Sequence, residues 1–196
     1  MTTDLQVLLP SSIARGFALL LLAGLPVLAA ATGIRESQVE EITASRPAVY
    51  VSAALSMAAL GGITLAVAAW QRIPAAALGW SVSGTGVALL WAAGATAAGL
   101  FAVWLITGTG RRLGLRESGL ALALMPRSAA DRRGFVLLAI VAAVGEEYIY
   151  RGYTLHVLAE WWGDPWLAAA ATAVSFGFAH GYQRVVGVVR ATALGG

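Results

Sequence analysis

Three long apolar stretches without a charged side chain most constrain what this chain can fold into. They run over residues 16–33, 49–70 and 85–106. Each is long enough to cross about 30 Å of hydrocarbon as a helix. Inside a membrane every backbone N–H and C=O must bond within the protein, and a helix satisfies both locally. The stretches therefore predict an all-α, polytopic membrane helical bundle, with residues 1–196 forming a single integral membrane domain.

The composition and the charges support this prediction. The 196 residues are 59% hydrophobic and only 12% charged, about half the charged fraction of a soluble domain. The 13 basic residues are all arginine; those of the 107–133 connection are Arg111, Arg112, Arg116, Arg127, Arg132 and Arg133. The positive-inside rule then predicts this connection in the cytoplasm and the N-terminus outside. We expect the lipid bilayer as the surroundings and no nucleic-acid partner. The absence of cysteine excludes disulfides, thiolate zinc sites and cysteine nucleophiles.

Further segments bring the expected total to five or six hydrophobic helices. Residues 1–10 carry no basic residue, which favours a retained first span over a cleaved signal peptide. Pro26 predicts a kink in that span. The other expected elements are an interfacial helix within 118–126 ended by Pro126, a fourth membrane helix over 134–150, a shorter mixed segment over 153–162, a helix over 166–179 with Asp164 as N-cap, and a further apolar segment over 185–196.

Three ionisable groups follow directly on the uncharged residues 134–144: Glu146, Glu147 and Arg151. A charge at mid-membrane costs several kcal/mol, so these groups must be paired or face a polar cavity. Glu147 and Arg151 are four residues apart, about 40° round an α-helix, and can form an ion pair. Glu146 and Arg151 are about 140° apart in the same geometry. We therefore expect Arg151 to neutralise Glu147 and to leave Glu146 free.

A histidine at the end of the next apolar helix is the expected companion of Glu146. His180 shares a helix face with Phe176, four residues earlier. A carboxylate and an imidazole on adjacent helices could hold one water, and the carboxylate could take its proton as a general base. Other readings of these residues remain: a structural Glu147–Arg151 pair, a packing role for His180 and Phe176, or the ion pathway of a proton-coupled transporter. His156 is expected to lie at the membrane interface.

The expected depth of Glu146 conflicts with a cytoplasmic site. Glu146 lies 13 residues after Arg133, or about 20 Å along a helix. With Arg133 at the cytoplasmic face, this distance predicts a position nearer the outer face.

Two motifs resemble those of a known family. "GEEYIYRG" at 145–152 matches E-E-x-x-x-R, and "FGFAH" at 176–180 matches F-x-x-x-H, of the CAAX protease and bacteriocin-processing (Abi, Rce1-like) family of intramembrane glutamic endopeptidases. The resemblance covers residues 127–187. It implies Glu146 as the general base, Glu147 and Arg151 as its supporting pair, and His180 as a holder of the water, with Phe176 packing beside it.

The resemblance also implies what the protein would act on and need. The reaction would be hydrolysis of a peptide bond of a peptide or protein substrate at the membrane, without a metal or other cofactor. Eukaryotic relatives trim prenylated CAAX proteins, and bacterial relatives are associated with bacteriocin processing or immunity. We accordingly expect a multi-pass protein of the plasma membrane, of bacterial origin.

One departure from the family bears on activity. The family carries a third motif, a His followed four residues later by Asn or a similar polar residue, on a later helix, and residues up to Gly196 do not contain it. We expect the chain to be C-terminally incomplete relative to the family and to be slow or inactive, because such groups stabilise the oxyanion and contribute about 10²–10³ in rate each. Two alternatives stay open: a zinc protease using Glu146, Glu147 and His180, and a non-catalytic immunity or partner-binding protein on the same scaffold.

Overall fold

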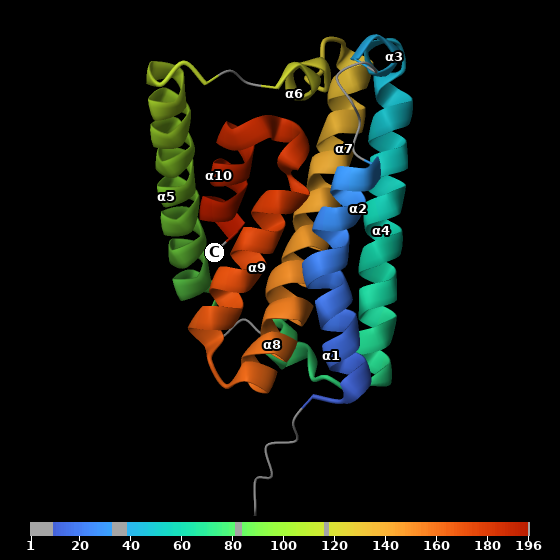
Figure 1. The fold of residues 1–196 in the computed structure, drawn as a ribbon, viewed down its shortest axis with the longest axis vertical. Helices are drawn as coiled ribbons and strands as arrows, with labels where there is room; N and C mark the ends of the chain where they lie inside the picture. The colour runs from blue at the N-terminus through green and yellow to red at the C-terminus, as the bar shows by residue number, and fades with distance from the viewer. Residues whose placement is uncertain (1–9, 33–38, 81–83, 116–117, 196) are drawn as a thin grey trace, which may run out of the picture.

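The computed structural model describes residues 10–32, 39–80, 84–115 and 118–195 (Figure 1). Within these ranges the chain forms helices and turns and no strand. Three helical stretches are long and apolar enough to cross a membrane, over Ser12–Ala31, Arg46–Trp70 and Thr85–Arg112. The protein is therefore an all-α polytopic bundle, as the apolar stretches predict. Arg35, Glu36, Arg116 and Gly196 lie outside the described residues.

The helices follow one another with short connections. In chain order they are α1 (Ser12–Leu19), η1 (Leu20–Gly24), α2 (Leu25–Thr32), α3 (Val39–Ala44), α4 (Arg46–Trp70), η3 (Ala75–Leu78), α5 (Thr85–Arg112), α6 (Gly119–Ala123), α7 (Ala129–Glu146), η4 (Glu147–Thr154), α8 (Leu155–Trp162), α9 (Pro165–Ala179), η5 (Gly181–Gln183) and α10 (Arg184–Gly195). η1 and η4 are π-helical, while η3 and η5 are 3₁₀ turns.

α1, η1 and α2 form one membrane helix, and a proline fixes how it meets α9. Pro26 has no N–H, so in α-helical geometry the carbonyl of Leu22, four residues earlier, loses its partner. The hydroxyl of Ser175 on α9 donates to that carbonyl at 2.5 Å. The π turn η1 lies directly before Pro26, where the sequence predicts a kink. The proline thus creates an acceptor that the neighbouring helix fills.

The largest difference from the sequence-based expectation is the length of the helix that carries the glutamates. Residues 134–150 and 153–162 were expected as two segments, but α7, η4 and α8 continue into one another without a break. The run from Ala129 to Trp162 spans roughly 50 Å at the usual rise per residue. A glycine inside a helix is tolerated, so Gly152 does not end it. The helix ends at Gly163, which adopts a left-handed φ of 69°.

Capping groups define where the last long helices begin. The Ser128 hydroxyl accepts the N–H of Asp131, and the Asp131 carboxylate accepts the N–H of Ser128, which together form a capping box at α7. Asp164 accepts the N–H groups of Trp166 and Leu167 at 2.9 and 3.0 Å. The predicted N-cap Asp164 is therefore confirmed, with Pro165 in the first turn.

The short helix α6 is held against the start of α4. The Arg46 guanidinium donates to the carbonyl of Ala123 at 2.6 Å, and the Tyr50 hydroxyl donates to that of Leu124 at 2.8 Å. α6 ends three residues before Pro126, in agreement with the interfacial helix predicted there. α3 and α6 lie at the same end of the bundle, at the top of Figure 1, whereas α8 and the start of α1 lie at the other end.

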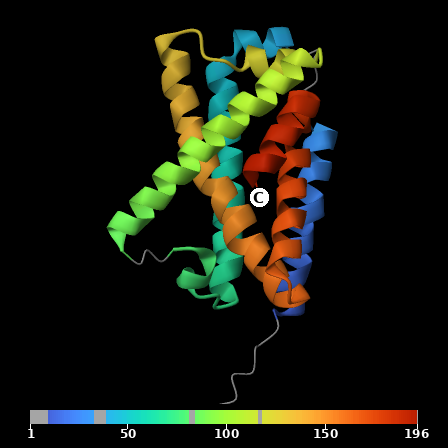
Figure 2. The same ribbon diagram turned by 90° about the vertical axis from the view of Figure 1, so that its left-hand side faces the viewer.

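Glycines allow close approach between the helices of the bundle. A Cβ at Gly134 would lie 3.0 Å from the Tyr50 ring, and one at Gly145 would lie 2.7 Å from Met57. α7 and α4 therefore touch along much of their length. α5 lies at the side of the bundle, is inclined to the other helices (Figures 1 and 2) and packs against α10, since a Cβ at Gly110 would lie 3.0 Å from Val186. Its apolar residues are not buried inside the protein.

The contacts between α7 and α4 show where Glu146 lies along α4. Its neighbour Gly145 packs against Met57, which lies near the middle of α4 rather than near its outer end. The distance along α7 from Gly134 to Gly145 is longer than the matching distance along α4 from Tyr50 to Met57. α7 is thus inclined to α4, as Figure 2 shows. Because of this tilt, Glu146 lies beside the middle of α4, although it follows Arg133 by 13 residues.

Gly177 is predicted to be essential for the packing of α9 on α10. An added Cβ there would overlap the Thr192 hydroxyl and lie 3.0 Å from the backbone carbonyl of Val188. We expect Gly177→Ala to lower the free energy of unfolding by about 1–3 kcal/mol, measured by denaturant titration in detergent micelles. Gly61→Ala is the matched control, because no atom lies within 4 Å of its added Cβ. Equal stability of Gly177→Ala and wild type would contradict the packing.

The capping box predicts how stability depends on pH. Backbone N–H groups of Arg127 and Ser128 donate to the Asp131 carboxylate, each at 3.1 Å. These bonds, led by that from Arg127, lower the pKa of Asp131. A lowered folded-state pKa gives stability that is present above the unfolded pKa and is lost as pH falls through the folded value.

We expect Asp131→Asn to be less stable than wild type at neutral pH. The difference should shrink as pH falls below about 4, measured by thermal unfolding in detergent at a series of pH values. A difference that is constant from neutral to acid pH would contradict this role of the carboxylate.

Candidate active site

The ionisable groups predicted to form a site come together where α7 and η4 face α9. Glu146 is the last residue of α7, and Glu147 and Arg151 belong to the π-helical η4. Thr154 stabilises the widened turn, because its hydroxyl donates to the carbonyl of Ile149, five residues earlier, at 2.8 Å. Single π turns inside α-helices are frequent at functional sites.

The ion pair predicted from the i,i+4 spacing forms. The Arg151 guanidinium contacts the Glu147 carboxylate. It also donates to the carbonyl of Leu194 in the last turn of α10. Arg151 therefore neutralises Glu147 and joins η4 to the end of α10. The pair is partly open to its surroundings, since 34% of the Arg151 side chain and 58% of the Glu147 side chain are exposed.

Glu146 is less separated from Arg151 than α-helical geometry predicts. The two charges attract each other electrostatically. The expected 140° separation assumes 3.6 residues per turn, whereas the π-helical turns of η4 bring residues five apart onto nearly the same side. Arg151 thus contributes positive charge to both glutamates, although it contacts Glu147.

Glu146 and His180 face each other across the gap between α7 and α9. The Glu146 Oε1 atom lies 3.9 Å from the His180 Nε2 atom, which is too far for a direct hydrogen bond. The other ring nitrogen, Nδ1, lies 2.9 Å from the carbonyl of Phe176. A carbonyl can only accept, so Nδ1 carries the hydrogen and Nε2 of the neutral ring presents a lone pair. Two acceptors therefore face one another, and one water can donate to both.

Phe176 holds the imidazole in this orientation. Its ring centroid is 4.5 Å from that of His180 and 5.1 Å from that of Tyr150, the latter in a T-shaped contact. Gly195 of α10 leaves room for the ring, because a Cβ there would lie 2.7 Å from Phe176. The predicted packing position of Phe176 beside His180 is thus observed.

A cavity of about 280 Å³ opens beside these groups. Its polar lining comes from Glu146, His180 and the hydroxyl-bearing rings of Tyr150 and Tyr182, and its apolar lining comes from α2 and α4 through Leu25, Leu28, Ala29, Met57 and Leu60. A mostly apolar cavity with a few converging polar groups is typical of a binding or catalytic site.

A family model described as "Type II CAAX prenyl endopeptidase Rce1-like" matches residues 131–196. This part of the chain, about a third of its length, is similar to that family. The match contains both motifs and all four polar groups of the site, and it excludes α1 to α6. Neither the curated proteins nor the solved structures contained a match.

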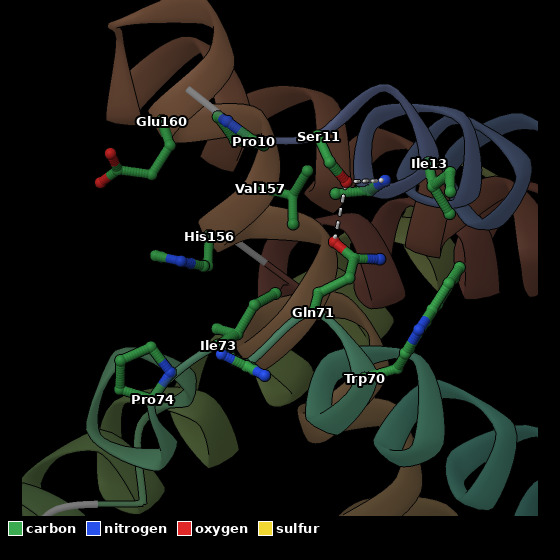
Figure 3. Close-up of a pocket in the computed structure, with 12 residues that line it drawn as sticks. Pro10, Ser11, Ile13, Trp70, Gln71, Ile73, Pro74, His156, Val157 and Glu160 are labelled. Atoms are coloured by element: carbon green, nitrogen blue, oxygen red, sulfur yellow. Dashed lines mark hydrogen bonds between the residues drawn. The ribbon is translucent and has the colours of Figure 1, made fainter. Parts of the chain in front are cut away.

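A second, larger cavity lies away from the Rce1-like motifs. It has a volume of about 530 Å³ and lies between the start of α1, the end of α4 and α8. Figure 3 shows His156 and Glu160 at one side of it and the hydrogen bond from the Ser11 hydroxyl to Gln71 at the other. His156 thus belongs to this second cavity, at the end of the bundle, where the sequence places it at the membrane interface.

A group of polar residues on the turn between α9 and α10 and on α10 was not predicted from the sequence. Tyr182 lines the cavity with Glu146, and its hydroxyl accepts a hydrogen bond from Gln183 at 2.8 Å. Gln183 in turn accepts from Arg190 at 3.1 Å. Helical spacing could not have indicated the pair, because Gln183 lies in the 3₁₀ turn η5 and the backbone at Arg184 is not helical. Among the described residues no group of three or more His, Cys, Asp and Glu side chains could hold a metal ion.

Removing Glu147 or Arg151 from their ion pair should lower the free energy of unfolding by unequal amounts. Glu147→Gln removes a partly exposed charge and should lower the free energy of unfolding by less than about 1 kcal/mol. Arg151→Ala also leaves the Leu194 carbonyl without its donor and should cost about 2–3 kcal/mol. Denaturant titration of both variants and of the double variant gives the coupling between them. Equal losses would show that the bond to Leu194 contributes nothing.

Proposed function

We propose that this protein is an intramembrane endopeptidase in which Glu146 activates a water held with His180. The family match supports a protease-type enzyme in the membrane. The observation that carries the finer proposal is the facing pair of acceptors, 3.9 Å apart, at the edge of the 280 Å³ cavity. A water that donates to both atoms has its oxygen lone pair turned away from them, into the cavity.

The proposed chemistry follows from these positions. The water oxygen attacks the carbonyl carbon of a peptide bond in the cavity, while Glu146 takes one of the water protons. The electrons of the C=O double bond move onto the oxygen and form an oxyanion. When the intermediate collapses, the C–N bond breaks and Glu146 gives the proton to the leaving amine. His180 orients the water, with its ring fixed by Phe176.

Arg151 and Glu147 support this reaction without touching the water. Arg151 attracts the Glu146 carboxylate electrostatically and so favours its ionised, basic form. Its contact with Glu147 leaves the three groups together with one net negative charge. The Glu147–Arg151 pair therefore limits the cost of holding a base inside the membrane. No metal is needed for any step of this proposal.

The substrate class follows from the lining of the cavity. The apolar side chains of α2 and α4 suit an apolar segment or a lipid chain next to the peptide bond to be cut. The name of the matching family points to a prenylated CAAX sequence. We therefore propose a membrane-anchored peptide or protein as the substrate, with such a C-terminal sequence as its first candidate.

Glu146→Gln should lower kcat for cleavage by about 10²–10⁴-fold, because an amide cannot take the water proton. The measurement uses the full chain in proteoliposomes and a fluorogenic, farnesylated CAAX peptide. Glu160→Gln is the matched control, since Glu160 lines the other cavity, and its rate should equal that of wild type. A chelator should leave the wild-type rate unchanged.

Unchanged cleavage by Glu146→Gln would overturn the proposal. Loss of cleavage on adding a chelator would instead support a metal-dependent protease. If Glu146→Gln retains a biological effect of the protein in cells, a non-catalytic role on the same scaffold is favoured.

A further inference from the structure

Three polar side chains form a directed chain of hydrogen bonds that ends at the cavity of the candidate site. The Arg190 guanidinium donates to the Oε1 atom of Gln183 at 3.1 Å. The Nε2 atom of Gln183 donates to the Tyr182 hydroxyl oxygen at 2.8 Å. Tyr182 and Gln183 lie in the turn η5 between α9 and α10, directly after His180, and Arg190 lies on α10.

The chemistry of arginine fixes the direction of both hydrogen bonds. A guanidinium can only donate, so the Gln183 amide must present its oxygen to Arg190 and its NH₂ group to Tyr182. The phenol oxygen of Tyr182 then accepts, and its own hydrogen is directed elsewhere. Hydrogen bonds in such a chain polarise one another. The positive charge of Arg190 therefore makes the Tyr182 hydroxyl a stronger donor.

The Tyr182 side chain lies beside the groups of the proposed reaction. It lines the 280 Å³ cavity together with Glu146 and His180. Its ring centroid is 6.1 Å from that of His180, and the charge of Glu146 acts on it electrostatically. The side chain is 40% exposed, so it borders the cavity instead of being enclosed by packing.

The backbone of the turn is specialised to hold this arrangement. A Cβ at Gly187 would overlap the Gln183 side chain, so the glycine lets Gln183 lie flat along α10 towards Arg190. Arg184 adopts φ 61° and ψ −169°, a region used almost exclusively by glycine. A non-glycine residue there costs about 1–3 kcal/mol and is typical of functional turns.

We propose that Tyr182 is a catalytic residue that donates a hydrogen bond to the oxyanion of the tetrahedral intermediate. This inference rests on the proposed peptidase function. When the water adds to the peptide carbonyl, the C=O electron pair moves to oxygen, and the Tyr182 O–H stabilises that charge without transferring its proton. Collapse restores the C=O bond and releases the amine. Gln183 and Arg190 act through Tyr182 and are positioning residues.

The first test is Tyr182→Phe, which removes the hydroxyl and keeps the ring. Loss of one oxyanion donor should lower kcat by about 10²–10³-fold, with a smaller change in KM. The assay is cleavage of the farnesylated CAAX peptide by the full chain in proteoliposomes. Tyr50→Phe is the matched control, because the Tyr50 hydroxyl bonds to Leu124 at the far end of α4, and its kcat should equal that of wild type.

The second test separates positioning from general stability. Gln183→Leu should lower kcat in the wild-type background but have no further effect in Tyr182→Phe, because its contribution passes through the missing hydroxyl. Thermal unfolding of each variant shows whether it is folded. If Tyr182→Phe does not fold, Gln183→Leu alone, with the ring intact, still measures the loss in kcat.

The outcomes distinguish this inference from the proposed function. If Glu146→Gln abolishes cleavage while folded Tyr182→Phe and Gln183→Leu keep the wild-type kcat, Tyr182 is no oxyanion donor and the peptidase proposal stands. If Glu146→Gln cleaves as fast as wild type, the peptidase mechanism fails and this inference fails with it. Absence of cleavage by wild type would contradict both.

Discussion

The cost of placing charges inside a membrane governs the C-terminal half of this structure. Glu146, Glu147 and Arg151 follow Gly145, which packs beside the middle of α4, and inside a membrane an unpaired charge costs several kcal/mol. Arg151 reduces this cost by contacting Glu147, attracting Glu146 and donating to Leu194. These partners come from η4, α7 and α10, so the charges are tolerable only when the three elements are packed together. Glu146 is then left facing His180 and a cavity, where its carboxylate can react.

The close packing of the helices around this site depends on the positions of glycines. Gly145 brings α7 against Met57, Gly177 brings α9 against α10, and Gly195 makes room for Phe176. In lipid, helices gain little from hydrophobic burial against one another, and small residues promote association by allowing dispersion contacts. The same glycines set the position of His180 relative to Glu146, so packing and site geometry share one cause.

Several features of the site could be predicted because they follow from local helical spacing. The pairing of Glu147 with Arg151, the contact of Phe176 with His180, and the cap at Asp164 all join residues within one turn of each other. The angle between Glu146 and Arg151 was wrong, because a π turn cannot be read from a pattern that assumes 3.6 residues per turn. The position of Glu146 beside the middle of α4 could not be predicted either, because residue counting along α7 does not include its tilt against α4.

The sequence by itself determined that this is an all-α membrane protein, where its spans lie, and which residues carry the Rce1-like motifs. These properties depend on hydrophobicity and on the spacing of residues along the chain, and both can be read from the amino-acid sequence. Only the tertiary structure decided that Glu146 and His180 face each other 3.9 Å apart, and that Arg190 is joined through Gln183 to Tyr182 beside the same cavity. Those relations depend on how separate helices cross and on turns at unusual backbone angles, which arise from the packing of the whole bundle.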